Sequence, residues 1–150
     1  MAIVSLINST VRPIGQSWSN LTFTSTLYLA PVLDLLLDEV PSEWQPELRL
    51  GLQEALVNAV KHGNSLDPSK QIIVKFSIVS QMYWWVIIDQ GDDLQSNCSS
   101  KDEPTPCQDL ECGRGFYILR KIFEHVHWDS YTHQLTLGKR IDLFKKPIIL

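Results

Sequence analysis

The stretch Glu54-Ala55-Leu56-Val57-Asn58-Ala59-Val60-Lys61-His62 decides the fold of this chain. It continues a segment that starts at Pro46 and is followed by Gly63-Asn64, which predicts a helix from Pro46 to about His62. At about 100° per residue, the apolar side chains of this helix share one arc, which is expected to face a sheet. These side chains are Leu48, Leu52, Ala55, Leu56, Ala59 and Val60.

A polar stripe borders this apolar arc. Glu54, Asn58 and His62 follow one another at intervals of four residues, and Gly51 lies one turn earlier, where it is expected to leave space beside the stripe. A carboxylate next to an amide at the edge of a core can hold a metal-bound ligand and direct a proton. Taken alone, however, the stripe favours an amphipathic helix with a solvated polar face, because Glu and Asn at this spacing are common.

Composition limits the classes of function. The chain has 150 residues, of which 44% are hydrophobic and 20% charged, as is typical of one globular domain. Its 13 basic and 17 acidic side chains give a net charge of -4, which argues against direct nucleic-acid binding. The apolar runs are too short to span a bilayer, and Met1–Thr10 lacks the features of a signal peptide. We therefore expect a cytoplasmic protein with no membrane association.

The remaining patterns predict a two-layer arrangement. Residues 1–20 have little periodicity and are expected to form an N-terminal arm. Strands that do not alternate regularly with helices indicate an α/β (α+β) sandwich with a mostly antiparallel sheet. The expected strands are Leu21–Leu29, Ile72–Val79, Met82–Asp89, Val126–Ser130 and Gln134–Phe144, and the further helices are Val32–Val40 and Gly113–Glu124.

A carboxylate is expected at the end of a buried strand. The apolar run Trp84–Ile88 continues directly into Asp89-Gln90-Gly91, where the carboxylate could accept a hydrogen bond from a ligand amine. A strand that ends in an ordinary turn is the alternative interpretation. The following segment, Gln90–Cys112, is long and polar, which is typical of a functional lid. Its cysteines are interpreted as reduced thiols, with a redox switch as the alternative.

Two glycines are expected to open the helix after this lid. In Gly113-Arg114-Gly115 the backbone amides could approach a polyphosphate, assisted by the helix N-terminus and the Arg114 charge. A flexible start of a helix would have the same pattern. Neither the Walker A pattern nor the Rossmann fingerprint is present in this chain.

The order of these motifs resembles the histidine-kinase/Hsp90-like (GHKL, Bergerat-fold) ATP-binding domain. Glu54–His62 is similar to the N box of that family, Asp89–Gly91 to its first glycine box, and Gly113–Phe116 to its second. The small bacterial anti-sigma-factor serine/threonine kinases are the branch that this chain resembles most. The resemblance implies a mostly antiparallel mixed sheet with helices on one face. It also implies an ATP-binding domain over residues 21–150, with a lid at 90–112.

The resemblance also implies roles for individual residues. Asn58 is expected to bind Mg²⁺ and Glu54 to act as the catalytic base, while Asp89 recognises the adenine amine of ATP. The other residues expected to contact the cofactor are His62, Gly91, Gly113, Arg114 and Gly115. Two positions depart from the pattern, since Asp93 replaces a second glycine and Tyr117-Ile118 stands where further glycines are common.

Three functions are compatible with these motifs. The resemblance implies a serine/threonine protein kinase and anti-sigma factor in a partner switch. Its substrate would be a STAS-domain anti-sigma-factor antagonist and its second partner a sigma factor, and a homodimer is compatible with this role. The first alternative is a nucleotide-dependent regulatory binding protein with little or no kinase activity. The other is a detached histidine-kinase catalytic domain, disfavoured because the chain has no room for a phospho-acceptor hairpin.

Overall fold

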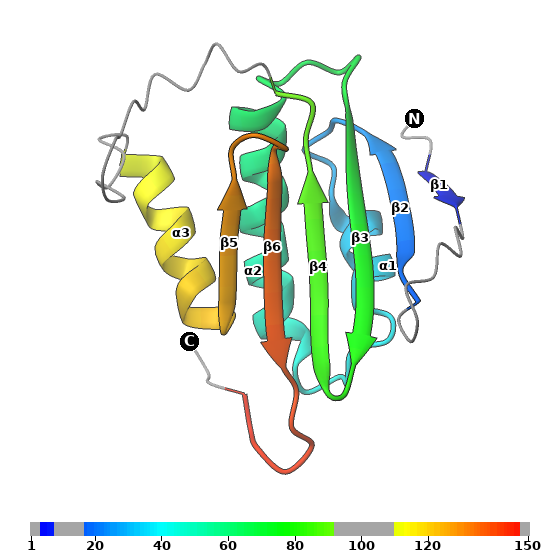
Figure 1. Cartoon of the computed structure of the whole chain (residues 1–150), viewed down its shortest axis with the longest axis vertical. Coiled ribbons are helices and arrows are strands. Elements are labelled where there is room, and N and C mark those ends of the chain that lie inside the picture. The colour runs from blue at the N-terminus through cyan, green and yellow to red at the C-terminus, as the bar shows by residue number, and fades with distance from the viewer. Residues whose placement is uncertain (1–3, 8–16, 92–109, 148–150) are drawn as a thin grey trace.

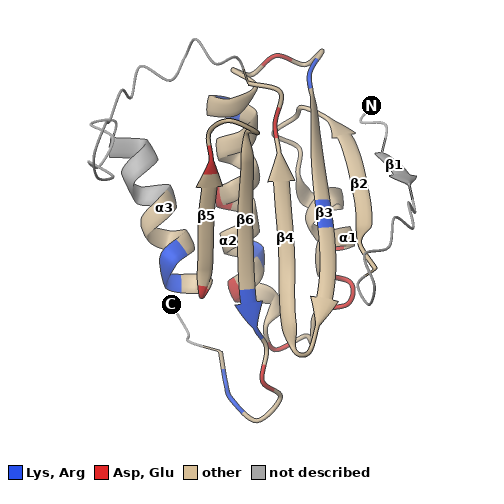
Figure 2. Ribbon diagram, viewed as in Figure 1, with Lys and Arg blue, Asp and Glu red and all other residues tan. Residues whose placement is uncertain are grey.

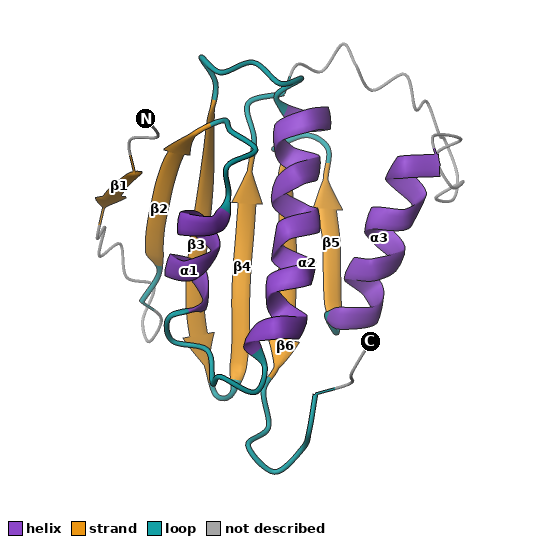
Figure 3. Cartoon of the chain, turned by 180° about the vertical axis from the view of Figure 1, so that it is seen from behind, coloured by secondary structure: helices purple, strands orange, loops and turns teal. Residues whose placement is uncertain are grey.

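The protein is a sheet covered by helices on one face (Figures 1 and 3). The computed structural model describes residues 4–7, 17–91 and 110–147, with side chains for 17–91 and 116–147. The elements within these residues are β1 (Val4–Ile7), β2 (Ser19–Thr24), α1 (Ala30–Leu37), α2 (Gln45–Asn58), the π-helical turn η1 (Ala59–Gly63), β3 (Gln71–Val79), β4 (Met82–Ile88), α3 (Leu110–Ile122), β5 (His125–Asp129) and β6 (Gln134–Arg140).

The sheet has the order β1-β2-β3-β4-β6-β5. Every pairing between these strands is antiparallel. β4 and β5 run in the same direction, but β6 returns between them and pairs with both (Figure 1). The predicted two-layer α/β sandwich with a mostly antiparallel sheet is therefore confirmed. Within the described strands, the parallel pairing that a mixed sheet requires is not seen.

The core lies between the sheet and the helices. All six apolar residues predicted for the arc of the long helix are buried, four on α2 and two, Ala59 and Val60, on η1. On β4, Trp85 and Ile87 face the helices and are buried, whereas Trp84 and Val86 alternate with them on the open face and are partly exposed. The predicted apolar face of α3 is confirmed, because Leu119, Ile122 and Phe123 are buried and Phe116 packs against the core.

The N-terminal third departs from the sequence prediction. The first 20 residues were expected to form an arm, but they contain β1, which pairs with β2, and the first two residues of β2 itself. The strand predicted to reach Leu29 ends at Thr24. A local turn follows, in which the amide of Tyr28 donates to the hydroxyl of Thr26, and Leu27 is exposed.

The last strand is also shorter than predicted. It ends at Arg140 rather than Phe144 because Asp142 organises a turn, its carboxylate accepting from the amide of Phe144 and its carbonyl from that of Lys145. Ile141 is buried as expected, but Leu143 is 72% exposed. None of the helices in the described part of the chain combines the length and apolarity needed to cross a membrane.

Candidate functional site

The Asp89 carboxylate lies at the end of the sheet where the C-terminal end of β4, η1 and the β5–β6 turn meet (Figure 1). Its side chain is 4% exposed. The amide of Gly91 donates to Asp89 Oδ1 at 2.8 Å, and His133 Nδ1 lies 3.2 Å from the same oxygen. The backbone amide of Asp89 donates to the carbonyl of His133, so this turn is attached to the end of β4 by two contacts.

Two glycines allow the backbone of η1 to approach this carboxylate. A Cβ at Gly63 would lie 2.3 Å from Asp89 Oδ2, and a Cβ at Gly91 would lie 2.7 Å from the carbonyl oxygen of Gly63. Any larger side chain at either position would push the two segments apart. Gly91, which we predicted to contact the cofactor, therefore packs against Gly63 and Asp89 within the protein. Gly63 has a role that the sequence analysis did not identify.

Burial raises the pKa of the Asp89 carboxyl above its ordinary value. The hydrogen bond from the Gly91 amide opposes this rise most strongly, and the charge and hydrogen bond of His133 and the charge of Lys70 also lower the Asp89 pKa. A buried carboxylate held by donors is suited to accept a hydrogen bond from a ligand amine. This is the chemistry that the sequence predicted for Asp89.

Asn64 connects three elements around Asp89. It is fully buried, and its side-chain amide donates to the carbonyl of Gln71 at 3.1 Å. Its side-chain oxygen accepts from the amide of Gln90 at 2.7 Å, and the Gln90 side chain accepts from the amide of Gln71. Asn64 thus joins the end of η1 to the start of β3 and to the residue after Asp89.

Replacing Asn64 by alanine is expected to lower the free energy of unfolding by about 2–3 kcal/mol, since the amide of Gln90 and the carbonyl of Gln71 lose their side-chain partner. Urea unfolding of the variant measures this loss, with Gln53→Ala on the exposed face of α2 as a control that should stay within about 0.5 kcal/mol. An Asn64→Ala variant as stable as the wild type would show that this network does not hold the site together.

Glu54 and Asn58 lie at the margin of the apolar arc, as predicted. Both are half-buried on α2, between the buried residues that face the sheet and the exposed ones that do not. His62 does not continue their stripe, because the helix widens into η1 directly after Asn58 and the amide of Asn64 donates to the carbonyl of Ala59, five residues earlier. His62 is exposed in this turn. Such π-helical turns are frequent at functional sites.

Gly51 has a different role from the one predicted. A Cβ at this position would lie 2.6 Å from the ring of Phe123 and 3.2 Å from a methyl carbon of Ile122. The glycine therefore allows α2 and α3 to pack closely, and the expected space beside the polar stripe is absent. Helical spacing alone could not reveal this, because the contacting residues belong to another helix.

The second glycine box lies inside α3 and not at its start. The helix begins at Leu110, three residues before Gly113, so the predicted boundary is wrong and the last residues of the expected lid are helical. Gly113, Arg114 and Gly115 belong to the first half of the helix, where backbone amides donate to carbonyls of the helix itself. Most of the predicted lid, residues 92–109 with Asp93 and the first two cysteines, lies outside the described residues, as do the side chains of Cys112 and Arg114.

Within the described residues, no three His, Cys, Asp or Glu side chains are grouped so that they could hold a metal ion. An ion bound at Asn58 would take further ligands from a nucleotide and from water. Mg²⁺ has this preference, because it takes oxygen ligands and keeps several of its waters.

Comparison with known proteins shows the family of this fold. Residues 31–143 match the histidine kinase-like ATPase domain. The chain belongs to this family. It is also similar to two proteins named serine-protein kinase RsbW, at 27% identity over 86 residues in Bacillus licheniformis and 22% over 92 residues in Bacillus subtilis (strain 168).

These similarities cover part of each protein. The two alignments include 53% and 57% of this chain, and the chain spans 54% and 58% of the length of the two relatives. The stripe residues Glu54 and Asn58, the carboxylate of Asp89 and residues 113–115 all lie within the stretch that matches the ATPase domain. The predicted resemblance to the GHKL anti-sigma-factor kinases is confirmed at this level.

Proposed function

We propose that this protein is an ATP-dependent serine/threonine kinase and anti-sigma factor in a partner switch, in which it phosphorylates a STAS-domain antagonist. The observation that carries the proposal is the buried Asp89 carboxylate, which two glycines and His133 hold at the end of the sheet beside the N-box helix. The names of the two relatives support the kinase activity.

Asp89 would recognise the adenine base. Its buried oxygen atoms can accept a hydrogen bond from the exocyclic amine, and the low dielectric of the site strengthens this bond. Guanine carries an oxygen in place of that amine, so a carboxylate would repel it. A guanine base could therefore not bind in the orientation that we propose for adenine.

Glu54 and Asn58 would act at the phosphate end of the nucleotide. Mg²⁺ bound through the Asn58 amide oxygen would supply charge neutralisation for the phosphates. Glu54, half-buried one helical turn earlier, would orient the serine hydroxyl of the substrate and take its proton. Both side chains project from one rigid helix, which keeps their separation constant.

Gly113, Arg114 and Gly115 would complete the phosphate site. Their backbone amides can donate to a phosphate only if the start of α3 unwinds, because the helix otherwise uses these amides itself. Nucleotide binding would then be coupled to a shortening of α3. Nucleotide would then shift the protein between two conformations, in addition to any competition of its partners for overlapping surface.

The partners follow from the same proposal. A STAS-domain antagonist would present the serine that receives the phosphate, and a sigma factor would bind when the antagonist is phosphorylated and released. Both contacts would use surface close to the nucleotide, so that the bound nucleotide decides which partner is held. We propose a cytoplasmic location for the same reason, since both partners act there.

Incubation of the protein with γ-labelled ATP, Mg²⁺ and candidate STAS-domain proteins tests this function. The expected product is an acid-stable phosphoserine or phosphothreonine on the STAS protein. ATP binding without any transfer would favour the nucleotide-dependent binding protein that we consider as the alternative. An acid-labile, base-stable product would instead indicate histidine phosphorylation and contradict the proposal.

A further inference from the structure

His133 has a positive backbone φ. It is the last residue of the β5–β6 turn, with a φ of 51°, in the left-handed region that glycine adopts freely and that, among other residues, asparagine, aspartate and histidine adopt most often. Turns of this kind usually place glycine at such a position. Other residues of the chain share a positive φ, and what distinguishes His133 is that its side chain lies beside the Asp89 carboxylate.

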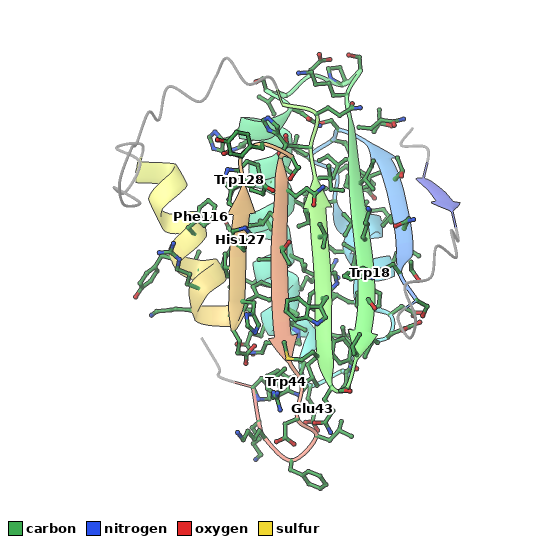
Figure 4. All side chains as sticks on the ribbon, viewed as in Figure 1. Trp18, Glu43, Trp44, Phe116, His127 and Trp128 are labelled. Atoms are coloured by element: carbon green, nitrogen blue, oxygen red, sulfur yellow. The ribbon has the colours of Figure 1, made fainter. Side chains whose placement is uncertain are left out.

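The imidazole of His133 is held against the base-binding carboxylate. Its Nδ1 lies 3.2 Å from Asp89 Oδ1, and a Cβ at Gly91 would approach the same nitrogen to 3.0 Å. The ring of Trp128 meets the imidazole edge-on, with the ring centroids 6.0 Å apart. Figure 4 shows Trp128 on β5, toward the end of the sheet that bears this turn. The side chain is 20% exposed, so that the imidazole remains in contact with solvent.

We propose that His133 is a positioning residue of the nucleotide site, which keeps the Asp89 carboxylate oriented and ionised so that ATP binding persists in mildly acidic solution. This inference rests on the proposed function, because it concerns the carboxylate that would bind adenine. It adds to the expected ATP site a residue that lies outside the N box and both glycine boxes.

The charges around the pair support this role. Burial raises the pKa of Asp89, and His133 is the neighbouring group that lowers it through both charge and a hydrogen bond. The imidazole of His133 therefore favours the ionised form of the buried Asp89 carboxylate. The other titratable groups at this end include Lys70, which lowers the Asp89 pKa less, and the exposed His62. They also include two carboxylates that accept hydrogen bonds within their own turns: Asp129, which is influenced by the charge of His127, and Asp67, which is influenced by that of Lys70.

Two substitutions separate the side chain from the backbone conformation. His133→Gly removes the imidazole and suits the positive φ, so the variant is expected to fold with an unchanged or higher melting temperature. His133→Asn also tolerates this φ, and its side-chain nitrogen stands at the same number of bonds from the backbone as Nδ1. It therefore keeps a hydrogen-bond donor near Asp89 but cannot become charged.

The expected result is a loss of affinity that grows in acid. At pH 7.5, calorimetry should give a Kd for Mg-ATP about 5–10-fold weaker for His133→Gly than for the wild type, as for the loss of one charge-assisted hydrogen bond. This ratio should be larger at pH 6.0 than at pH 7.5, because the loss of His133 raises the pKa of Asp89. His133→Asn should recover most of the affinity at pH 7.5 but not at pH 6.0.

NMR titration of the Asp89 carboxyl carbon, without nucleotide, gives a second measurement. Its pKa should be higher in His133→Gly than in the wild type. Gln81→Gly serves as the matched control, because Gln81 also has a positive φ but lies in the β3–β4 turn at the other end of the sheet. This control should change neither the Asp89 titration nor the Kd for ATP.

Two results would overturn the inference: equal ATP affinities of His133→Gly and the wild type at both pH values, or an unchanged Asp89 titration. A wild-type protein that binds no ATP would instead contradict the proposed function. In that case the NMR titration alone decides whether His133 controls the Asp89 carboxyl.

Discussion

Replacing Lys139 by methionine is expected to lower the free energy of unfolding by about 3–5 kcal/mol at neutral pH, because it leaves a buried carboxylate without its cation. Lys139 is on β6 and its side chain is 7% exposed. The Nζ atom donates to the carbonyl of Ile122 at 2.7 Å and lies 3.9 Å from Glu47 Oε1 and 3.6 Å from Glu124 Oε1. Removing this one ammonium therefore affects α2, the end of α3 and the loop that precedes β5.

Glu47 makes this substitution costly. Its side chain is 5% exposed, and neither of its carboxylate oxygens accepts a hydrogen bond from the described part of the chain. The ammonium of Lys139, which also lies 5.2 Å from the ring centroid of Trp44, is the cation that compensates its charge. Figure 2 shows acidic and basic residues together at this end of the molecule, and Figure 4 shows that Trp44 and Trp128 lie toward opposite ends.

The cost of Lys139→Met is expected to depend on pH. Burial raises the pKa of Glu47, Lys139 lowers it and Glu124 raises it further, so the pKa rises again when the lysine is removed. The folded Glu47 pKa lies above that of the unfolded chain, so at pH values between the two the folded state binds more protons than the unfolded state. The free energy of unfolding therefore falls as the pH rises through this window. The variant should therefore differ most from the wild type above the folded Glu47 pKa and regain stability towards pH 5.

Chemical unfolding at pH 5.0 and pH 8.0 measures this dependence. Arg140→Met is the matched control, since it removes a cation from the next residue of β6, where the side chain is exposed, and should change stability by less than about 0.5 kcal/mol. The double variant Lys139→Met with Glu47→Leu should recover much of the loss. A loss of the same size at both pH values would contradict the role assigned to Glu47.

Replacing Glu54 by glutamine is expected to reduce phosphate transfer by about 10²–10⁴-fold while ATP affinity stays within about twofold of the wild type. The amide preserves the shape of the side chain but cannot accept the proton of the substrate hydroxyl. Initial rates with labelled ATP and a STAS-domain substrate measure the loss of transfer, and calorimetry measures the affinity.

Glu43→Gln is the control for this substitution. Glu43 is exposed and lies toward the opposite end of the molecule from the Asp89 site, so that transfer should be unchanged in this variant (Figure 4). If Glu54→Gln transferred phosphate at the wild-type rate, Glu54 would not be the base. If it lost ATP binding as well as transfer, its role would be to hold the nucleotide rather than to move a proton.

The site residues whose positions depend on a single helix or strand could be predicted from the sequence alone. The spacing of Glu54 and Asn58 within one helix, and the position of Asp89 after a buried strand, follow from local periodicity. The widening of the helix after Asn58 could not be predicted from the local sequence. The π-helical turn ends at Gly63 and Asn64, which contact Asp89 after β4 and Gln71 on β3, and both contacts join distant parts of the chain.

The supporting residues are determined by contacts between distant parts of the chain. Asn64 and Gln90 are 26 residues apart, and His133 reaches Asp89 from another hairpin. Lys139 follows Leu135 and Leu137 on the inward face of β6, a position for which alternation predicts an apolar residue. Only the fold shows that Glu47 compensates this lysine.

Calorimetric titration of the wild type and of Asp89→Asn with Mg-ATP tests the central claim most directly. We predict that the wild type binds ATP and that Asp89→Asn binds it about 10–100-fold more weakly, because the buried amine of adenine loses its charged acceptor. No binding by the wild type, or equal affinities of the two proteins, would contradict the assignment of this end of the sheet as the nucleotide site.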